Sequence, residues 1–144
     1  MSTTEEPLTT APSWAQFDAL YRRVSAEVGK RLAEVCGLTL PEYAVLALFA
    51  DQHCTTHRMA DLAKHVDVSA STATRLVARL EGKGLLRRCP NPDDGRGVLA
   101  ERTPAGTALL RQAAEVVDST TSRLVTPEAL LPRPDSDLAS PLHP

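Results

Sequence analysis

The sequence contains no long hydrophobic run, and nothing in it approaches the ~18 consecutive apolar residues that a membrane-spanning helix needs. Its first residues, MSTTEEPLTTAPS, are acidic and polar, whereas a secretory signal peptide is basic and then apolar. These absences exclude a membrane-spanning protein and predict a cytoplasmic one. The length of 144 residues is enough for one domain with a single core.

Cysteine and aromatic residues are scarce. The three cysteines (Cys36, Cys54, Cys89) are odd in number and widely spaced, so they predict reduced thiols instead of a disulfide framework. The sequence also has no phosphate-binding glycine loop, no nucleophile elbow and no paired acid–base constellation. We therefore expect a protein that is not an enzyme and that binds no cofactor.

The charge is unevenly distributed. The whole chain has a formal net charge of −2, but the segment from Arg75 to Arg102 holds seven basic and four acidic residues. A basic segment in an acidic protein is a candidate footprint for nucleic acid, which the average charge conceals.

Two long segments have the periodicity of amphipathic helices. Apolar residues recur at three- and four-residue steps from Trp14 to Val35, which predicts a helix that ends near Gly37. A second long helix begins at Thr103-Pro104. We expect its apolar side to comprise Ala108, Leu109, Ala113, Val116, Val117 and Leu124.

Between these helices, Thr39 is placed to cap a shorter helix that runs through EYAVLALFA, and the polar link DQHCTTH follows. RMADLAKHV then predicts a short helix with Ala60, Ala63 and Val66 facing inward. In the turn DVS, Asp67 suits a left-handed conformation and Ser69 caps the next helix. That helix, ASTATRLVARLEGKG, has a predicted apolar face of Ala73, Leu76, Val77 and Leu80.

A hairpin follows. LLRRC and VLAER predict two extended segments, and Pro90 and Pro92 keep the connector PNPDDGRG out of both helix and central sheet. Helix, turn, helix and hairpin in this order predict an α+β, mainly helical fold with a winged helix-turn-helix.

MADLAKHVDVSASTATRLVARLEGKGLLRR, the Asp-Gly-Arg loop and TPAG together resemble the MarR family of bacterial winged-helix regulators. The similarity covers roughly residues 14–125 and is strongest from Met59 to Gly106. It implies a homodimer joined by its N- and C-terminal helices, whose two winged domains bind successive major grooves of a pseudo-palindromic operator on double-stranded DNA. Many members repress transcription and release DNA on binding a small, often phenolic, ligand or on cysteine oxidation.

The resemblance also divides the chain. Residues 13–125 form the MarR-like domain, in which residues 39–103 bind DNA and residues 13–37 and 104–125 are the dimerisation helices. We expect a flexible N-terminus over residues 1–12 and a disordered, proline-rich tail over residues 126–144.

Three positions depart from the family pattern. The segment 126–144 replaces the usual final helix, which weakens the expectation of a standard dimer interface. Gly95 replaces the first of two basic residues that usually follow the acid of the loop. Arg102 stands where an apolar residue is usual, so we expect altered strand packing.

On the second helix of the helix-turn-helix, the predicted core leaves a polar face outward. Hydroxyl groups at a helix N-terminus can bind phosphates or base edges, and Arg75 can make a bidentate contact with guanine. The alternative is that Ser71 and Thr72 only cap the helix and that Arg75 is solvated. Because the hairpin follows directly, we favour DNA contact by Ser69, Ser71, Thr72, Thr74, Arg75 and Arg79.

The connector PNPDDGRG invites two other interpretations, which the residues exclude. As a calcium loop with Gly95 at the required turn, it would put Pro90 and Pro92 at ligand positions, where proline offers no side-chain oxygen. As catalytic carboxylates, Asp93 and Asp94 point in different directions and have no nucleophile or base nearby in the sequence.

The family resemblance assigns this connector to DNA instead. It implies that Asp94 braces the wing by pairing with an arginine, while Arg96, on a turn permitted by Gly95, reaches into the minor groove. Further candidates for phosphate contacts, which a solvated charged face would explain equally well, are Arg58, Lys64, Arg87 and Arg88.

Two other sites remain open. Cys54 and His57 in DQHCTTH belong to metal-favoured residue types, but their spacing matches no strong zinc pattern, so we assign no metal. A pocket for a small aromatic effector would lie between the first helix, the second helix and the winged domain. Its candidates are Trp14, Tyr21 and Tyr43, which could equally fill the core and the dimer interface.

The sequence thus predicts a sequence-specific DNA-binding transcriptional regulator, a homodimeric repressor released by a small-molecule effector. One alternative is a winged-helix protein-interaction module that does not bind DNA. Another is a thiol- or metal-responsive sensor that uses Cys54 and His57.

Overall fold

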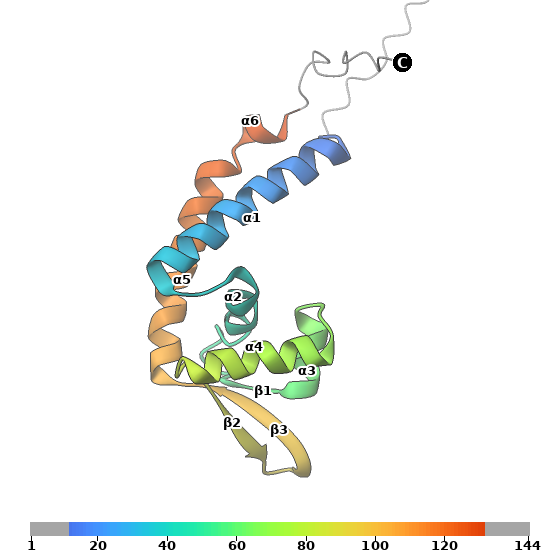
Figure 1. Ribbon diagram of the computed structural model, residues 1–144, viewed down its shortest axis with the longest axis vertical. Coiled ribbons are helices and arrows are strands. Elements are labelled where there is room, and N and C mark those ends of the chain that lie inside the picture. Colours follow the sequence, from blue (N-terminus) through green and yellow to red (C-terminus); the bar gives the residue numbers. More distant parts are fainter. Residues whose placement is uncertain (1–11, 132–144) are drawn as a thin grey trace, which may run out of the picture.

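The computed structural model describes residues 12–131, except the side chains of Asp94 and Arg96. Two long helices, α1 (Trp14–Cys36) and α5 (Pro104–Leu124), lie side by side and form an arm. Three shorter helices and a small sheet form a winged lobe at the lower end of that arm, and one short helix lies at its upper end (Figure 1). No helix within residues 12–131 is both long enough and apolar enough to cross a membrane.

Helix α1 begins and ends at strong capping residues. The Ser13 hydroxyl accepts from the Gln16 backbone N–H, and the Gln16 side chain accepts from the Ser13 N–H at 2.9 Å, which completes a capping box. Gly37 ends the helix in a left-handed conformation with φ 64°, as the sequence predicted. Of the apolar residues of this helix, only Val28 and Leu32 are fully buried, so most of its apolar stripe is not covered within one chain.

Helix α5 follows Thr103, whose side chain accepts from the Gly106 N–H at 3.0 Å. The expectation that Ala108 faces inward is wrong: Ala108 is exposed and Leu110 is buried. Two residues correspond to about 200° around a helix, so these side chains lie on opposite faces. The buried residues of α5 are Gly106, Leu110, Ala113, Val116 and Thr120.

The winged lobe contains α2 (Leu40–Ala47), α3 (Met59–His65) and α4 (Ala70–Gly82). Asp67 adopts the predicted left-handed conformation with φ 53° between α3 and α4, and the predicted core face of α4 is confirmed. In α3, however, Ala60 is exposed and Leu62 is fully buried. Met59 packs against the core. Successive residues of a helix are rotated by about 100°, so the next residue, Ala60, faces away from the core.

A three-stranded antiparallel sheet completes the lobe. Strand β3 (Asp94–Arg102) lies between β1 (Thr56–Arg58) and β2 (Leu86–Asn91). Two expectations were wrong here. Thr56 and His57, taken as the end of a polar link, and Arg58, taken as the start of the next helix, pair with residues 99–101 as a strand. Pro90, expected outside the sheet, pairs with Val98, which is possible because β2 is an edge strand.

The core lies where the lower half of α1, α2, α4, the base of the sheet and α5 meet. Phe49, which follows α2, is the largest fully buried side chain. Arg102, where the resemblance led us to expect an apolar residue, donates a hydrogen bond to the carbonyl of Phe49. The polar residue therefore joins β3 to the end of α2.

A half-buried ion pair joins the end of α4 to the start of α2. The Lys83 Nζ lies 2.5 Å from the Glu42 Oε2 and 2.7 Å from the Gly37 carbonyl oxygen, to which it also donates. Thr39 donates to the other Glu42 oxygen at 3.0 Å. Glu42 is only 2% exposed, so this cluster fixes α4 relative to the elbow between α1 and α2.

A second seam joins the sheet to the arm at Thr103. Its backbone N–H donates to the Leu85 carbonyl oxygen at 3.1 Å, and its hydroxyl donates to the Gly84 carbonyl oxygen at 2.6 Å. The same hydroxyl oxygen caps α5. Strand β3, the turn after α4 and the first turn of α5 are thus held together by one residue.

The expectation of a disordered segment from residue 126 is wrong for its first residues. Pro127–Leu130 form the short helix α6, because Thr126 caps it and Pro127 suits a first helical turn. The Gln16 side chain of α1 donates to the Leu131 carbonyl at 3.4 Å, which holds α6 against the arm. Residues 1–11 and 132–144, also predicted to be disordered, lie outside the described residues.

Candidate nucleic-acid interface

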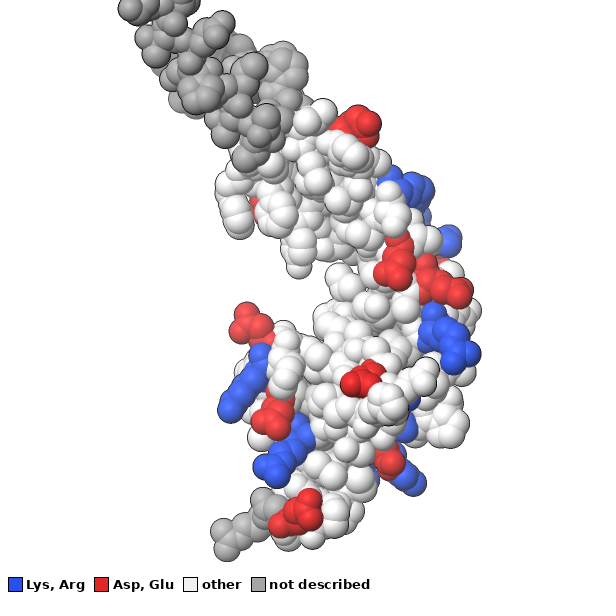
Figure 2. Space-filling model, turned by 180° about the vertical axis from the view of Figure 1, so that it is seen from behind, with Lys and Arg blue, Asp and Glu red and all other residues white. Residues whose placement is uncertain are grey.

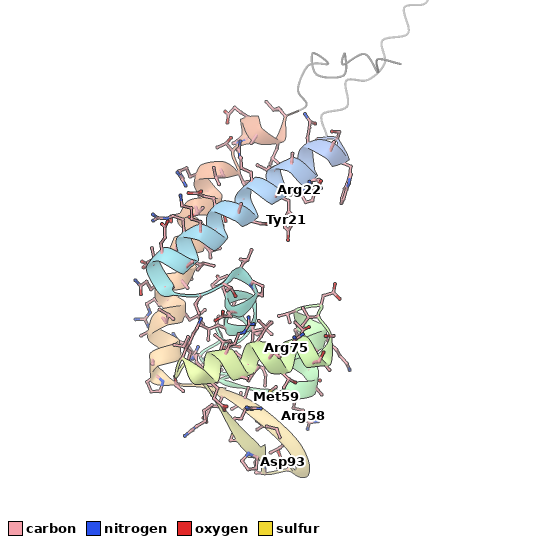
Figure 3. All side chains as sticks on the ribbon, in the orientation of Figure 1. Tyr21, Arg22, Arg58, Met59, Arg75 and Asp93 are labelled. Carbon is pink, nitrogen blue, oxygen red and sulfur yellow. The ribbon has the colours of Figure 1, made fainter. Side chains whose placement is uncertain are left out.

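The outward face of α4 carries two arginines one helical turn apart. Because Ala73, Leu76, Val77 and Leu80 face the core, Arg75 and Arg79 are left on the exposed face. Neither arginine has an ion-pair partner among the residues that the structure describes. Figure 3 labels Arg75 midway along α4 and Asp93 at the tip of the hairpin. The guanidinium groups of α4 are therefore available to an external anion.

The hydroxyls at the start of α4 are mainly engaged within the helix. The Ser69 Oγ accepts from the Thr72 N–H at 3.2 Å and donates to the Thr72 Oγ1 at 2.9 Å. The Ser71 Oγ lies 3.1 Å from the Ser69 Oγ, and Thr74 donates to the Ala70 carbonyl at 2.9 Å. Ser69 thus caps α4 and engages the Thr72 hydroxyl, whereas Ser71 and Thr74 remain exposed at the surface.

The two arginines of β2 are paired with acids that the sequence analysis did not single out. Arg87 makes hydrogen bonds and an ion pair with Glu101 on β3, with an Nε–Oε2 distance of 3.1 Å. Arg88 pairs with Glu81 of α4, at 3.0 Å between Nη2 and Oε1. These bonds raise the pKa of both guanidinium groups, and the bonds from Arg88 lower the pKa of Glu81. A phosphate would have to compete with these carboxylates.

The remaining candidates for phosphate contact are differently placed. Arg58 lies at the junction of β1 and α3, and Lys64 lies in the last turn of α3 (Figure 3 labels Arg58). Both are exposed, and within residues 12–131 neither takes part in an ion pair. Both are therefore open to an external anion at α3.

The wing is a tight hairpin whose strands are longer than the sequence suggested. Asn91 pairs with Asp94, so only Pro92 and Asp93 connect the strands. Asn91 is buried, and its side-chain oxygen accepts from the Asp93 N–H at 3.0 Å. This turn was missed, although asparagine two residues before the donor is its usual sequence signal. The expectation that Gly95 permits the turn is wrong, because Gly95 lies in β3 without a positive φ and the turn is formed by Pro92 and Asp93. The predicted roles of Asp94 and Arg96 fall on side chains outside the described part of the structure.

The candidate effector residues are divided between the arm and the core. Trp14 and Tyr21, 78% and 62% exposed, project from the N-terminal half of α1, and the Trp14 ring lies 5.9 Å from that of Phe17. Tyr43 is half-buried against the core, and burial, together with the charge of Asp118, raises its pKa. The structure thus places two of the three residues on an exposed helix face and the third beside the core.

The residues of DQHCTTH point to different neighbours. The His57 Nε2 lies 2.8 Å from the Leu48 carbonyl, and its ring packs edge-on against Phe49. Cys54 is exposed, and its nearest polar contact is the Thr56 carbonyl at 3.5 Å. Over the described residues, no three His, Cys, Asp or Glu side chains gather where they could hold a metal ion.

Helix α3, the Asp67 turn, α4 and the β2–β3 hairpin define a winged helix-turn-helix protein, the class that the sequence predicted. Residues 38–98 match the model of the MarR family. Together with the relatives described below, this match shows that residues 38–98 of the chain are similar to the MarR family.

Named relatives agree in sequence and in structure. The chain is 37% identical over 75 residues to the multiple antibiotic resistance protein MarR of Salmonella typhimurium, across 52% of this chain and 51% of that protein. It is 30% identical over 89 residues to the HTH-type transcriptional repressor Rv2887 of Mycobacterium tuberculosis, across 62% of this chain and 63% of that protein. The chain thus spans about half the length of the first relative and less than two thirds of the second.

The solved structures extend the similarity over more of the chain. The crystal structure of Sco3205, a MarR family transcriptional regulator from Streptomyces coelicolor in complex with DNA, has a TM-score of 0.72 and 28% identity. It covers 87% of this chain and 76% of that chain. The shared fold therefore includes the arm as well as the winged lobe.

Proposed function

We propose that this chain is a sequence-specific DNA-binding transcriptional regulator, a cytoplasmic homodimeric repressor that a small effector releases from its operator. The observation that carries this proposal is the pair Arg75 and Arg79, exposed on one face of α4 and without carboxylate partners among the described residues. The hairpin next to α4 supplies a second contact, and the similarity to a repressor and to a DNA-bound regulator supports the assignment.

In this proposal α4 lies in the major groove. Arg75 makes the bidentate base contact, while Arg79, one turn further on, binds the phosphate backbone. Arg58 and Lys64 add phosphate contacts from the side of α3. Arg96 enters the minor groove from the wing, where one arginine gains from the enhanced negative potential of a narrow groove.

The partner that we propose for the arm is a second copy of the chain. Trp14, Phe17 and Tyr21 are exposed along α1, and Leu130 and Leu131 are exposed at α6. Figure 2 shows that the arm above the hollow side of the molecule is largely free of charged residues. Exposed aromatic side chains at this density favour burial against an equally apolar face, and a twofold dimer pairs each face with its copy. The small aromatic effector would bind beside this face and change the dimer geometry.

A fluorescence-anisotropy titration tests the DNA-binding part of the proposal. The probe is labelled promoter DNA from upstream of the protein's own gene, titrated at two salt concentrations beside unrelated DNA. Arg75→Ala should weaken promoter binding by roughly tenfold or more and reduce the preference over unrelated DNA, because a bidentate base contact is lost. Arg96→Ala should weaken binding as well and identify the wing contact.

Arg23→Ala is the matched control, because Arg23 is exposed on α1 and away from the winged lobe. Its affinity for the promoter should equal that of the unmodified chain. If the unmodified chain binds neither DNA above background, the regulator proposal fails, and a protein-interaction module becomes the better explanation of the exposed surfaces.

A further inference from the structure

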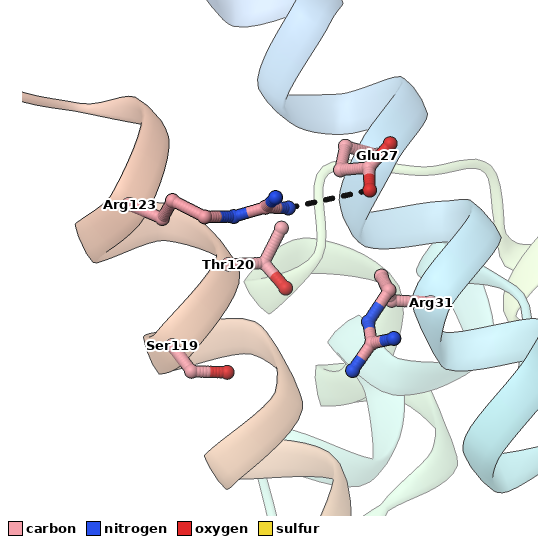
Figure 4. Close-up of a pocket in the computed structure, with 5 residues that line it drawn as sticks. All are labelled: Glu27, Arg31, Ser119, Thr120 and Arg123. Atoms are coloured by element: carbon pink, nitrogen blue, oxygen red, sulfur yellow. Dashed lines mark hydrogen bonds and ion pairs between the residues drawn. The ribbon is translucent and has the colours of Figure 1, made fainter.

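A polar hollow of about 370 Å³ lies between α1 and α5, away from both the α4 face and the wing. Its five lining residues are Glu27, Arg31, Ser119, Thr120 and Arg123 (Figure 4). The volume is within the range of about 300–1,000 Å³ that small-molecule sites occupy. None of the lining side chains is aromatic or aliphatic, so the hollow differs in chemistry from a pocket for a flat aromatic effector.

Thr120 is the buried polar group of this hollow. The residue is 3% exposed and lines the hollow. Figure 4 shows the hydroxyl directed toward the space between Ser119 and Arg31. A threonine hydroxyl can donate a hydrogen bond to a ligand oxygen, so this orientation places a donor at the wall of the hollow.

Two guanidinium groups reach the same hollow from opposite helices. Arg31 of α1 has no ion-pair partner within the described residues, whereas Arg123 of α5 contacts Glu27 at 3.3 Å between Nη2 and Oε1. That distance is long for a charge-assisted hydrogen bond, which is ordinarily about 2.7–2.9 Å. The two arginines and one glutamate leave a local excess of one positive charge.

We propose that this hollow binds a small oxyanion, a carboxylate or phosphate group of a compact polar metabolite. The anion accepts hydrogen bonds from Arg31 and Arg123, and the hydroxyls of Thr120 and Ser119 complete its coordination. Guanidinium groups are suited to this role because their planar fork matches the oxygen pair of a carboxylate or phosphate. The bound anion bridges α1 and α5 and so ties the two helices of the arm together.

Substituting Glu27 should change the affinity for the anion in the opposite direction from substituting either arginine. Its carboxylate occupies part of the donor capacity of Arg123 and repels an incoming anion. Neutralising Glu27 therefore strengthens binding, whereas neutralising either arginine weakens it. A purely structural role of the three residues would not produce this pattern.

Isothermal titration calorimetry on the full chain tests the site, with inorganic phosphate and malonate as separate probes and the ionic strength held constant by sodium chloride. We expect saturable binding of at least one probe, which also distinguishes phosphate from carboxylate chemistry. Arg31→Gln and Arg123→Gln should each weaken it by about tenfold, and Thr120→Val should weaken it by about threefold. Glu27→Gln should strengthen it.

Arg22→Gln is the matched control, because Arg22 lies on the same helix but pairs with Asp18 at 2.9 Å outside the hollow. Its affinity for the probe should be unchanged, and circular dichroism verifies that each variant is folded. The proposal is overturned if neither probe gives saturable heat, or if Arg31→Gln behaves as Arg22→Gln does. No DNA is present in this titration, so its result is independent of the proposed regulatory function.

Discussion

Replacing Lys83 with methionine removes the charge that holds Glu42 in the interior while keeping a side chain of similar length. Glu42 is 2% exposed, and without Lys83 its carboxylate keeps, among the described residues, only the hydrogen bond from the Thr39 hydroxyl. Removing one partner of a buried ion pair costs about 3–5 kcal/mol. Because the Lys83 side chain is 38% exposed and water can reach the site, we expect a smaller loss of about 2–3 kcal/mol in the free energy of unfolding.

Urea denaturation followed by circular dichroism measures this loss, provided that the m-value is unchanged. The double variant Glu42→Leu/Lys83→Met should recover most of the stability, since replacing both partners with apolar side chains is often nearly neutral. Lys64→Met, at an exposed lysine outside any described ion pair, should change stability by less than about 0.5 kcal/mol. If Lys83→Met is no more destabilising than Lys64→Met, the ion pair does not fix α4 as we infer.

Gly106→Ala should lower the free energy of unfolding by at least about 3 kcal/mol in the same assay, because a Cβ would lie 2.1 Å from the Leu85 carbonyl oxygen. Gly29→Ala should be neutral or stabilising, because a Cβ there would have no atom within 4 Å. Glu101→Gln should release Arg87 and increase DNA affinity about two- to fivefold with a steeper salt dependence, and an unchanged affinity would contradict a phosphate contact by Arg87. The pKa of Glu81 is lowered from 4.5 in the fold, so its pairing stabilises the chain above that pH and is lost as the pH falls further. Thermal melts from pH 7 to pH 3 should therefore show a smaller acid-induced loss for Glu81→Gln, and identical profiles would refute the linkage.

The parts of the fold that the sequence predicted are those that local physics determines. The face of α4 follows from helical periodicity, the Asp67 turn from tolerance of positive φ, and the end of α1 from Gly37. Strand β1 was missed because three residues of a polar segment carry no alternating pattern, and only pairing with β3, more than forty residues later, makes them a strand.

The residues of the candidate site likewise include some that the local sequence predicts and some that depend on long-range contacts. The exposure of Arg75 and Arg79 could be predicted because the core spacing of α4 determines it. The pairing of Arg87 and Arg88 with carboxylates could not be predicted, because Glu101 and Glu81 reach them through the register of the hairpin and the packing of α4 on β2. The hollow between α1 and α5 joins residues up to 96 positions apart, so no local pattern indicates it.

The seam at Thr103 has a mechanical consequence. Since one residue bonds to the Gly84 and Leu85 carbonyls and also caps α5, the winged lobe cannot swivel freely on the end of the arm. Helix α5 acts as a rigid lever of 21 residues, about 30 Å long, so a rotation of about 5° at its far end displaces α4 by roughly 2–3 Å. In the proposed dimer, a small change where the two arms meet would be enough to move each α4 out of register with the spacing of successive major grooves.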